Sequence, residues 1–450
     1  MGRLFGTDGI RGVANTELTC ELAVKIGKAA AKVLISGSHN RHPKVLIGRD
    51  TRISGNMLEG ALGAGFCSMG VNVVLLGAVP TPAVAYLVTK YGADAGVMIS
   101  ASHNPAEYNG IKIFNGDGFK LSDELEDQIE EMIGHERLDE NLPIGGELGN
   151  ITGDKKAVDE YIDHLMSTID DNLSGMSIAL DCANGSACTT ARKLFEGLGA
   201  KITVLNDQPD GVNINQDCGS TDMDMLSNFV IENKCDIGFA FDGDADRCLA
   251  VDENGTLIDG DCIMAIIADY GKRSGKLKKN SVVVTVMTNI GFFRFAAEHD
   301  IKGVTTKVGD RYVLEEMLKN GYNLGGEQSG HIIFLDHANT GDGQLTAVQL
   351  AWILKKSGKT ASELSEIMSS YPQVLINVEV SPEGKERLKD DEEIQKTIQR
   401  IERELDNDGR VLVRASGTEP LIRVMLEGRY FEEIEPMANE IADLIAERLT

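Results

Sequence analysis

The stretch KVLIGRDTRISG, residues 44–55, joins a short apolar run to a polar turn with glycine, and the helical pattern MLEGALGAGFCSM follows it. The same order recurs in SIALDCANGSACTTA from Ser177 and in VVVTVMTNIGFFRFA from Val282. Each copy predicts a strand, a turn and a helix, and repeated units of this kind build parallel α/β sheets. The sequence therefore predicts an α/β fold of three successive domains with mixed, mainly parallel sheets.

The pattern changes after Tyr371 and Pro372, where strand patterns alternate with two helical patterns. Polar stretches rich in turn residues near residues 136–154 and 252–260 mark two further boundaries. A chain of 450 residues is too long for a single hydrophobic core. We expect α/β domains over residues 1–153, 154–254 and 255–370 and a smaller C-terminal α+β domain over residues 371–450.

Composition and charge argue against several classes of function. The formal net charge is -26, so no general affinity for nucleic acid or for an anionic membrane is expected. The first residues, MGRLFGTDGIRG, carry charges and glycines where a signal peptide needs an apolar segment. The longest apolar stretch, residues 71–88, is interrupted by Asn72, Pro80 and Pro82. The eight cysteines form no CxxC pair, so we expect free thiols in a cytoplasmic protein.

The stretch SASHNP, residues 100–105, follows an apolar strand pattern from Gly96 to Ile99. Ser102 is therefore expected on a loop at the end of a strand, where open α/β sheets place their ligands. The alternative is an ordinary turn, because serine, asparagine and proline build turns without any chemical role. This stretch alone does not decide between the two.

The stretch DGDADR places Asp242, Asp244 and Asp246 at every second position. Three carboxylates so close repel one another unless a cation lies among them. Read as an EF-hand calcium loop, the stretch has Glu253 at position 12, where that loop needs a glutamate. However, Arg247 occupies position 6, where the loop needs a glycine, and the flanking residues look like strands rather than helices. A solvated acidic turn is the third alternative. We favour a Mg²⁺ site at the end of a strand, since Mg²⁺ takes few carboxylates and leaves room for a phosphate oxygen.

Two further stretches carry groups that suit a ligand. GEQSGH, residues 326–331, presents a glutamate, a serine and a histidine between glycines, which suits a polyol, although a plain turn is the alternative. RASGTEPLIR offers arginine side chains and a loop backbone to an anion, although a salt bridge on a hairpin is the alternative. The candidates are Glu327, Ser329 and His331 in the first stretch and Arg414, Ser416, Gly417, Thr418 and Arg423 in the second.

Seven motifs in one order, TDGIRG, SASHNP, YNGIK, DGDADR, TKVGDRY, GEQSGH and RASGTEP, resemble the α-D-phosphohexomutase superfamily. The resemblance runs from Phe5 to the C-terminus and implies four domains around a central cleft. It implies that Ser102 carries a phosphoryl group and donates it to a sugar phosphate. The resulting sugar 1,6-bisphosphate then reorients and returns its other phosphate to Ser102, which splits one difficult transfer into two steps.

The resemblance also implies a role for each candidate residue. One Mg²⁺ per subunit would be held by the three aspartates together with Ser102. Lys112 is the favoured proton-transfer residue, and His331 is its competitor. The remaining candidates for charge stabilisation or acid/base work are Arg11, His103 and Arg247. The sugar hydroxyls would contact Glu327 and Ser329, and the remote phosphate would contact Arg414, Ser416, Gly417, Thr418 and Arg423.

Within the superfamily, GEQSGH and SASHNP resemble the phosphoglucosamine branch. Phosphomannomutase-like members more often carry methionine at the position of Gln328 and glycine at that of Ala101. The implied reaction converts glucosamine 6-phosphate to glucosamine 1-phosphate for UDP-N-acetylglucosamine and peptidoglycan precursors, with glucosamine 1,6-bisphosphate or glucose 1,6-bisphosphate as activator. The phosphoglucomutase/phosphomannomutase branch, a metal-dependent sugar-phosphate phosphatase and a non-catalytic binder stay open. A homodimer is a further expectation, although the sequence leaves the subunit number open.

Overall fold

The computed structural model describes residues 4–6, 8–35, 43–416 and 420–450. The chain divides into two compact units. The larger unit comprises Met1–Met287 and Ile301–Ile367, and the smaller unit comprises Thr288–Asp300 and Met368–Thr450. Among the described residues, no helix combines the length and the apolar character that crossing a bilayer requires.

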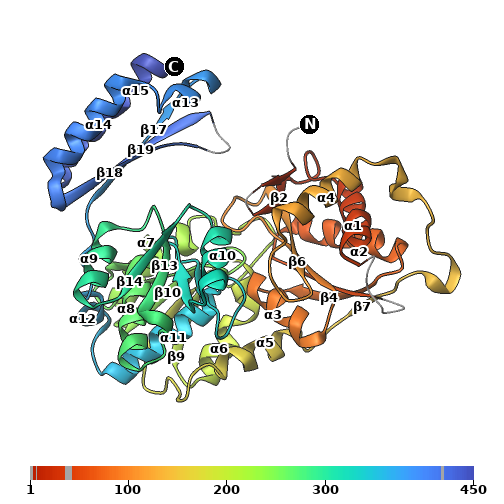
Figure 1. The fold of residues 1–450 in the computed structure, drawn as a ribbon. Coiled ribbons are helices and arrows are strands. Elements are labelled where there is room, and N and C mark those ends of the chain that lie inside the picture. The colour runs from red at the N-terminus through yellow and green to blue at the C-terminus, as the bar shows by residue number, and fades with distance from the viewer. Residues whose placement is uncertain (1–3, 7, 36–42, 417–419) are drawn as a thin grey trace. The chain divides into compact units, whose positions relative to one another are not determined.

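The first segment of the larger unit forms a seven-stranded sheet with helices on both faces (Figure 1). Its strands are β1 (Phe5–Gly6), β2 (Gly9–Val13), β3 (Lys44–Arg49), β4 (Asn72–Ala78), β5 (Ala95–Ile99), β6 (Tyr108–Asn115) and β7 (Ile151–Gly153). Its helices are α1 (Cys20–Ile35), α2 (Ile53–Ser68), α3 (Thr81–Tyr91) and α4 (Asp123–Ile133). β3 pairs in parallel with β4 and β5, and β6 pairs antiparallel with β5 and β2. The stretch at 44–55 therefore forms β3, the turn and the start of α2, as predicted.

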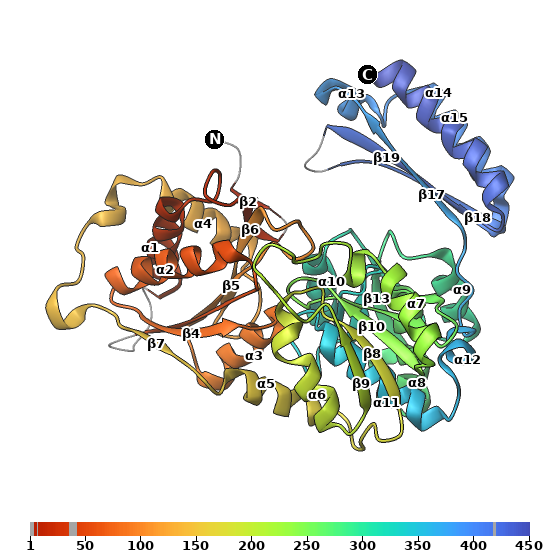
Figure 2. The same cartoon turned by 180° about the vertical axis from the view of Figure 1, so that it is seen from behind.

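The second segment forms a five-stranded sheet in the order β12-β11-β10-β8-β9 (Figure 2). Its strands are β8 (Ser177–Asp181), β9 (Lys201–Leu205), β10 (Ile237–Phe241), β11 (Cys248–Asp252) and β12 (Leu257–Ile258). Its helices are α5 (Ala157–Met166), α6 (Ala191–Gly197) and α7 (Asp224–Asn233). β8 pairs in parallel with β9 and β10, whereas β10 and β11 are antiparallel neighbours. The DGDADR loop connects these last two strands.

The third segment forms a four-stranded sheet in the order β14-β13-β15-β16. Its strands are β13 (Ser281–Thr285), β14 (Lys302–Thr306), β15 (Leu324–Gly326) and β16 (Ile332–Phe334). Its helices in the larger unit are α8 (Gly260–Arg273), α10 (Asp310–Asn320), α11 (Gly343–Ser357) and α12 (Ala361–Ser365). β13 pairs in parallel with β14 and β15, and β15 pairs antiparallel with β16. The GEQSGH turn lies between β15 and β16.

The smaller unit contains a three-stranded antiparallel sheet in the order β17-β19-β18. Its strands are β17 (Gln373–Glu379), β18 (Gly409–Ala415) and β19 (Leu421–Gly428). Its helices are α9 (Ile290–Glu298), α13 (Pro382–Arg387), α14 (Glu392–Leu405) and α15 (Phe431–Leu449). Apolar residues of α14, α15 and the sheet form one buried cluster. The C-terminal segment is therefore an α+β layer, as the change of sequence pattern predicts.

Two features differ from the division predicted from turn residues. β12 lies beyond residue 254, because Leu257 and Ile258 pair antiparallel with Val251 and Ala250 of the second sheet. Helix α9 follows β13 in sequence, yet it belongs by contacts to the smaller unit. The backbone N–H of Ile290 at its first turn donates to Oε2 of Glu427 over 3.1 Å. The mixed α/β fold with a smaller C-terminal layer is confirmed.

Backbone hydrogen bonds fix the loop between β10 and β11 against both neighbouring segments. The N–H of Thr81, at the start of α3, donates to the carbonyl of Asp244 over 2.9 Å. The N–H of Gly343, at the start of α11, donates to the carbonyl of Ala245 over 3.1 Å. Main-chain bonds of this kind hold a loop whatever the charge state of its side chains. The larger unit thus gathers loops from three segments around the DGDADR loop.

Candidate active site

Ser102 lies on the loop that follows β5, as predicted. Its side chain is buried, and its Oγ donates a hydrogen bond of 2.6 Å to Oδ2 of Asp242. Nδ1 of His103 lies 3.5 Å from the same Oγ. The backbone of Ser102 has φ 53, in the left-handed region that side chains other than glycine rarely adopt. A strained, buried serine held against a carboxylate is typical of a functional position.

A buried arginine holds the main chain of this loop. Arg52 is fully buried, and its Nε donates to Oδ2 of Asp50 over 2.8 Å. The same carboxylate oxygen accepts a 2.6 Å hydrogen bond from Oγ of Ser100. Charge-assisted hydrogen bonds of this kind are about twice as strong as neutral ones. The guanidinium also donates to four carbonyl oxygens of the loop, those of Ser102, Asn104, Pro105 and Tyr108.

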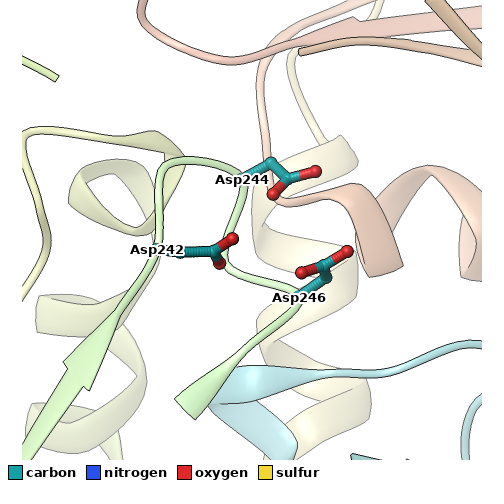
Figure 3. Close-up of side chains that lie close together, drawn as sticks. All are labelled: Asp242, Asp244 and Asp246. Carbon is teal, nitrogen blue, oxygen red and sulfur yellow. The ribbon is translucent and has the colours of Figure 1, made fainter. Parts of the chain in front are cut away.

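The three aspartates of DGDADR lie on one tight loop with their carboxylates turned toward a shared space (Figure 3). All three are buried, and one oxygen from each lies within 4.8 Å of the others. Burial and the charges of Asp246 and Asp244 raise the pKa of Asp242 to about 8. The flanking elements are strands, so the EF-hand alternative, which needs helices, is wrong.

The orphaned oxygens of this loop fit a hard divalent cation. Oδ1 of Asp244 and Oδ1 of Asp246 are buried and accept no hydrogen bond from any described residue. Buried polar atoms without partners are rare, and carboxylate oxygens are the ligands that Mg²⁺ prefers. A Cβ at Gly243 would lie 2.5 Å from the carbonyl oxygen of Ser102, so glycine is what lets the two loops meet. The metal prediction for these residues therefore has a geometric basis.

Lys112 reaches this loop from β6 and is almost completely buried. Its Nζ lies 2.8 Å from Oδ2 of Asp244, 3.5 Å from Oδ2 of Asp246 and 2.9 Å from Oδ2 of Asp8. Burial alone would lower the pKa of Lys112, but the three carboxylates raise it well above its usual range. Lys112 therefore holds its proton firmly. Oγ1 of Thr81 donates 2.5 Å to the same oxygen of Asp244 and fixes that carboxylate.

His331 lies on the other side of the aspartates, at the end of the GEQSGH turn. Its Nδ1 is 3.5 Å from Oδ2 of Asp246, and its Nε2 is 3.5 Å from Oδ2 of Asp310. The two carboxylates outweigh burial and raise the pKa of His331. The N–H of Gly341 also lies 3.1 Å from Nε2, in a position to donate to the neutral ring. The imidazole is thus placed to exchange a proton.

The other three predicted basic residues lie near the same centre. Nε of Arg247 is 4.0 Å from Oδ1 of Asp246, and the acidic groups around this guanidinium outweigh burial and raise its pKa. Nη2 of Arg11 is 2.5 Å from Oδ2 of Asp8. Burial and the nearby arginines lower the pKa of His103 to about 4, so its ring is neutral at pH 7. The two arginines thus add positive charge beside the buried aspartates.

The GEQSGH turn presents two polar groups of the predicted sugar site. Oε1 of Glu327 accepts a 3.1 Å hydrogen bond from the N–H of Gly309, just before α10. Oγ of Ser329 is buried and has no hydrogen-bond partner among the described residues. A buried hydroxyl without a partner is available to a ligand hydroxyl. The sugar-binding role of both residues remains a prediction.

The predicted phosphate-binding arginines lie in the smaller unit, on neighbouring strands. Arg414 of β18 and Arg423 of β19 are direct cross-strand partners. Burial and the charge of Arg423 lower the pKa of Arg414. Like charges directly opposite each other destabilise a sheet, so an anion between them would relieve the repulsion. Ser416, the residue after β18, is buried, whereas Gly417 and Thr418 lie outside the described residues.

Sequence reasoning missed three charged residues beside the centre, namely Asp8, Lys120 and Asp310. Nζ of Lys120 lies 2.6 Å from Oδ1 of Asp8 and 2.5 Å from Oδ2 of Asp310. Asp8 and Asp310 belong to TDGIRG and TKVGDRY, two motifs that carry the superfamily resemblance. Their place in these two motifs could have identified both aspartates as candidate site residues. Sequence reasoning also missed Arg52, although it lies in the stretch that predicts the fold.

Comparison with protein families shows that the chain matches four domain models of one family, one after another along its length. Each is described as a phosphoglucomutase/phosphomannomutase domain: domain I over residues 2–140, domain II over 159–255, domain III over 259–371 and the C-terminal domain over 375–444. A curated protein named Phosphoglucosamine mutase, from Clostridium novyi (strain NT), is 56% identical over 448 residues, which cover 100% of this chain and 99% of that protein.

Solved structures share the fold at much lower identity. A phosphoglucomutase/phosphomannomutase family protein from Burkholderia thailandensis matches with a TM-score of 0.83 and 24% identity, over 100% of this chain and 98% of that chain. The N-acetylphosphoglucosamine mutase of Aspergillus fumigatus, solved in complex with GlcNAc-6P and magnesium, matches with a TM-score of 0.70 and 19% identity. That match covers 99% of this chain and 96% of the other.

Proposed function

Because this chain belongs to the phosphoglucomutase/phosphomannomutase family and is a phosphohexomutase, we propose that it interconverts glucosamine 6-phosphate and glucosamine 1-phosphate. The observation that carries the proposal is the 2.6 Å hydrogen bond from Oγ of Ser102 to Asp242, within a buried group of three aspartates. A hydroxyl in that position is suited to carry a phosphoryl group beside a metal ion. The amino-sugar substrate rests on the name of the Clostridium novyi relative.

The proposed reaction has two transfers. In the first, the bond from phosphorus to Oγ of phospho-Ser102 breaks as a bond to the free sugar hydroxyl forms, and glucosamine 1,6-bisphosphate results. The sugar hydroxyl gives up its proton as it attacks, and Oγ of Ser102 takes one up as its bond to phosphorus breaks. His331 and Lys112, the two groups placed beside Asp246, are the candidates for these transfers: the neutral His331 ring can accept a proton, and the charged Lys112 can donate one. After the bisphosphate reorients, the second transfer returns its other phosphate to Ser102. Arg247 and Arg11 supply positive charge near the reacting oxygens.

The proposed metal is one Mg²⁺ per subunit, held by Asp242, Asp244 and Asp246 with an oxygen on Ser102. The solved Aspergillus fumigatus relative contains magnesium, and the orphaned aspartate oxygens described above fit such an ion. When bound, the cation would neutralise charge on the phosphoryl group. Glucosamine 1,6-bisphosphate or glucose 1,6-bisphosphate would act as activator by restoring phospho-Ser102. A homodimer remains a prediction. We place the enzyme in the cytoplasm, because all eight cysteines are free thiols.

The remote phosphate should depend on the arginine pair of the smaller unit. We expect Arg414→Ala and Arg423→Ala each to raise KM by about 10-fold and to lower kcat/KM by about 100-fold, because binding of the non-reacting phosphate positions the reacting end. Steady-state kinetics with the full substrate measure both effects. Arg429→Ala, an exposed position just beyond β19, is the matched control and should behave as wild type. Unchanged kinetics for both arginine variants would move the phosphate site elsewhere.

The substrate is tested by comparing three sugar phosphates at one Mg²⁺ concentration, each with its matching 1,6-bisphosphate. We expect kcat/KM to be highest for the glucosamine phosphates. Glucose phosphates should still be turned over slowly, because Glu327 can accept from a hydroxyl as well as from an ammonium. The assay must separate isomerised sugar phosphate from free phosphate. Free phosphate as the main product would indicate a phosphatase, and no turnover would indicate a binder. Equal or better efficiency on glucose or mannose phosphate would assign the chain to the neighbouring branch.

A further inference from the structure

Six buried or half-buried side chains of the larger unit form a closed ring in which acidic and basic groups alternate. Three of its members, Asp246, Lys112 and His331, belong to the site as predicted from the sequence. The ring runs Asp8, Lys120, Asp310, His331, Asp246, Lys112 and back to Asp8. Nζ of Lys120 lies 2.6 Å from Asp8 and 2.5 Å from Asp310, and the His331 ring lies 3.5 Å from Asp310 and 3.5 Å from Asp246. Nζ of Lys112 closes the ring, 3.5 Å from Asp246 and 2.9 Å from Asp8. Both candidate proton-transfer residues are therefore members of one connected network.

Lys120 closes this ring on the side away from the aspartate loop. Its ammonium bridges Asp8, which contacts Lys112, and Asp310, which contacts His331. The lysine side chain is 11% exposed, and no hydrogen bond or ion pair among the described residues joins it to Ser102 or to the aspartate loop. The mechanism above gives it no role. Its partners, however, are the groups that orient both proton-transfer side chains.

We propose that Lys120 is a positioning residue that sets the relative placement of Lys112 and His331 through Asp8 and Asp310. The proposal rests on the function proposed above. Oδ1 of Asp8 accepts from Lys120, while Oδ2 faces both Lys112 and Arg11, so Lys120 is the cation that holds the Oδ1 side of that carboxylate. Oδ2 of Asp310 likewise contacts both Lys120 and His331. Without the ammonium, two close carboxylates would repel each other and turn away from their partners.

The same two segments of chain are also joined by an ion pair that does not touch the ring. Arg311, next to Asp310, pairs with Asp123 and with Glu126 at the start of α4. Its Nη2 lies 2.8 Å from Oε1 of Glu126, and its side chain is 14% exposed. Arg311 and Lys120 therefore both hold the first segment against the third, with similar burial. Only Lys120 contacts carboxylates that orient Lys112 and His331, so Arg311 is the matched control.

The test compares Lys120→Met with Arg311→Met in the full-length enzyme. We expect Lys120→Met to lower kcat by about 10- to 100-fold, the cost of displacing a reacting group by roughly an ångström, while KM changes less than about 3-fold. Arg311→Met should keep kcat within about 3-fold of wild type, although both variants lose thermal stability. Lys120→Arg, which retains the charge, should recover most of the lost kcat. If Lys120 had a purely structural role, Lys120→Met and Arg311→Met would lower kcat by similar factors.

The outcomes separate this inference from the function on which it rests. Wild-type kcat in Lys120→Met, or an equal loss in Arg311→Met, would overturn the positioning role while the mutase activity stands. A wild-type enzyme that isomerised none of the three sugar phosphates would overturn both. If Lys120→Met does not fold, as judged by its thermal unfolding, Lys120→Gln takes its place. The glutamine amide can donate to one carboxylate or the other but carries no charge, so the same loss of kcat is required of it.

Discussion

Replacing Ser102 by alanine is expected to lower kcat by at least about 10⁴-fold while leaving the fold intact, because the phosphoryl carrier is lost and the second transfer has no acceptor. The hydroxyl makes a 2.6 Å hydrogen bond to Asp242 and a longer 3.5 Å contact with Nδ1 of His103, so its removal disturbs little packing. Serine and alanine both carry a Cβ, so the left-handed backbone of residue 102 disfavours both. Steady-state turnover and thermal unfolding of the same preparation measure the two halves of this expectation.

Ser100→Ala is the control for the position of the nucleophile. Ser100 is the nearest rival in the loop, but its Oγ donates to Asp50 and accepts from the N–H of Ser102. Its hydroxyl is therefore engaged away from the aspartate loop. Peptide mapping of wild-type protein should find the phosphate on Ser102 alone. A phosphate mapped to Ser100, or wild-type turnover by Ser102→Ala, would contradict the assignment.

Substitution of any of the three loop aspartates by asparagine is expected to weaken Mg²⁺ binding and to lower turnover by at least about 100-fold, since each change removes a negative ligand from the ion. Chelation of the metal should have the same effect on the wild-type enzyme. For Asp242→Asn, thermal stability without metal should be unchanged or higher. Burial and the neighbouring Asp246 and Asp244 raise the pKa of Asp242 to about 8, which means that its charge destabilises the metal-free fold.

Asp252→Asn provides the matched control for this series. Asp252 is a buried aspartate at the end of β11, but its Oδ1 accepts from the backbone N–H groups of Asn254 and Thr256 in the following turn. Its replacement should reduce stability without changing Mg²⁺ affinity, measured by isothermal titration. Full activity of the wild-type enzyme in excess chelator would rule out the metal role of the loop.

The fold was predictable because the strand, turn and helix signals are local. The middle of KVLIGR is apolar and forms the buried part of β3, and the polar turn that follows the strand leads into α2. The two strands around DGDADR were also predictable, and they exclude a helix-loop-helix calcium site. The sequence could not predict that α9 belongs to the smaller unit, because its contacts with Glu427 and Tyr371 join residues far apart in sequence.

The chemistry of single loops was predictable for the same reason, but their mutual contacts were not. Residue types identified Ser102, Lys112 and the aspartates as candidates. Lys120 is separated from Asp8 by 112 residues and from Asp310 by 190, so no local pattern connects the three. Arg52 was hidden differently, because it binds carbonyl oxygens, which every residue carries. Side-chain types in the sequence therefore do not show which carbonyl oxygens an arginine will bind.

The separation of Ser102 from Asp242 by 140 residues has a consequence for how the protein is made. Translation at about 5 to 20 residues per second places roughly 7 to 28 seconds between the two. During that interval the nascent chain carries the serine without the carboxylates that would hold a metal beside it. The serine is therefore made well before the aspartates, and a chain that ends between Ser102 and Asp242 carries the nucleophile without its metal-binding partners.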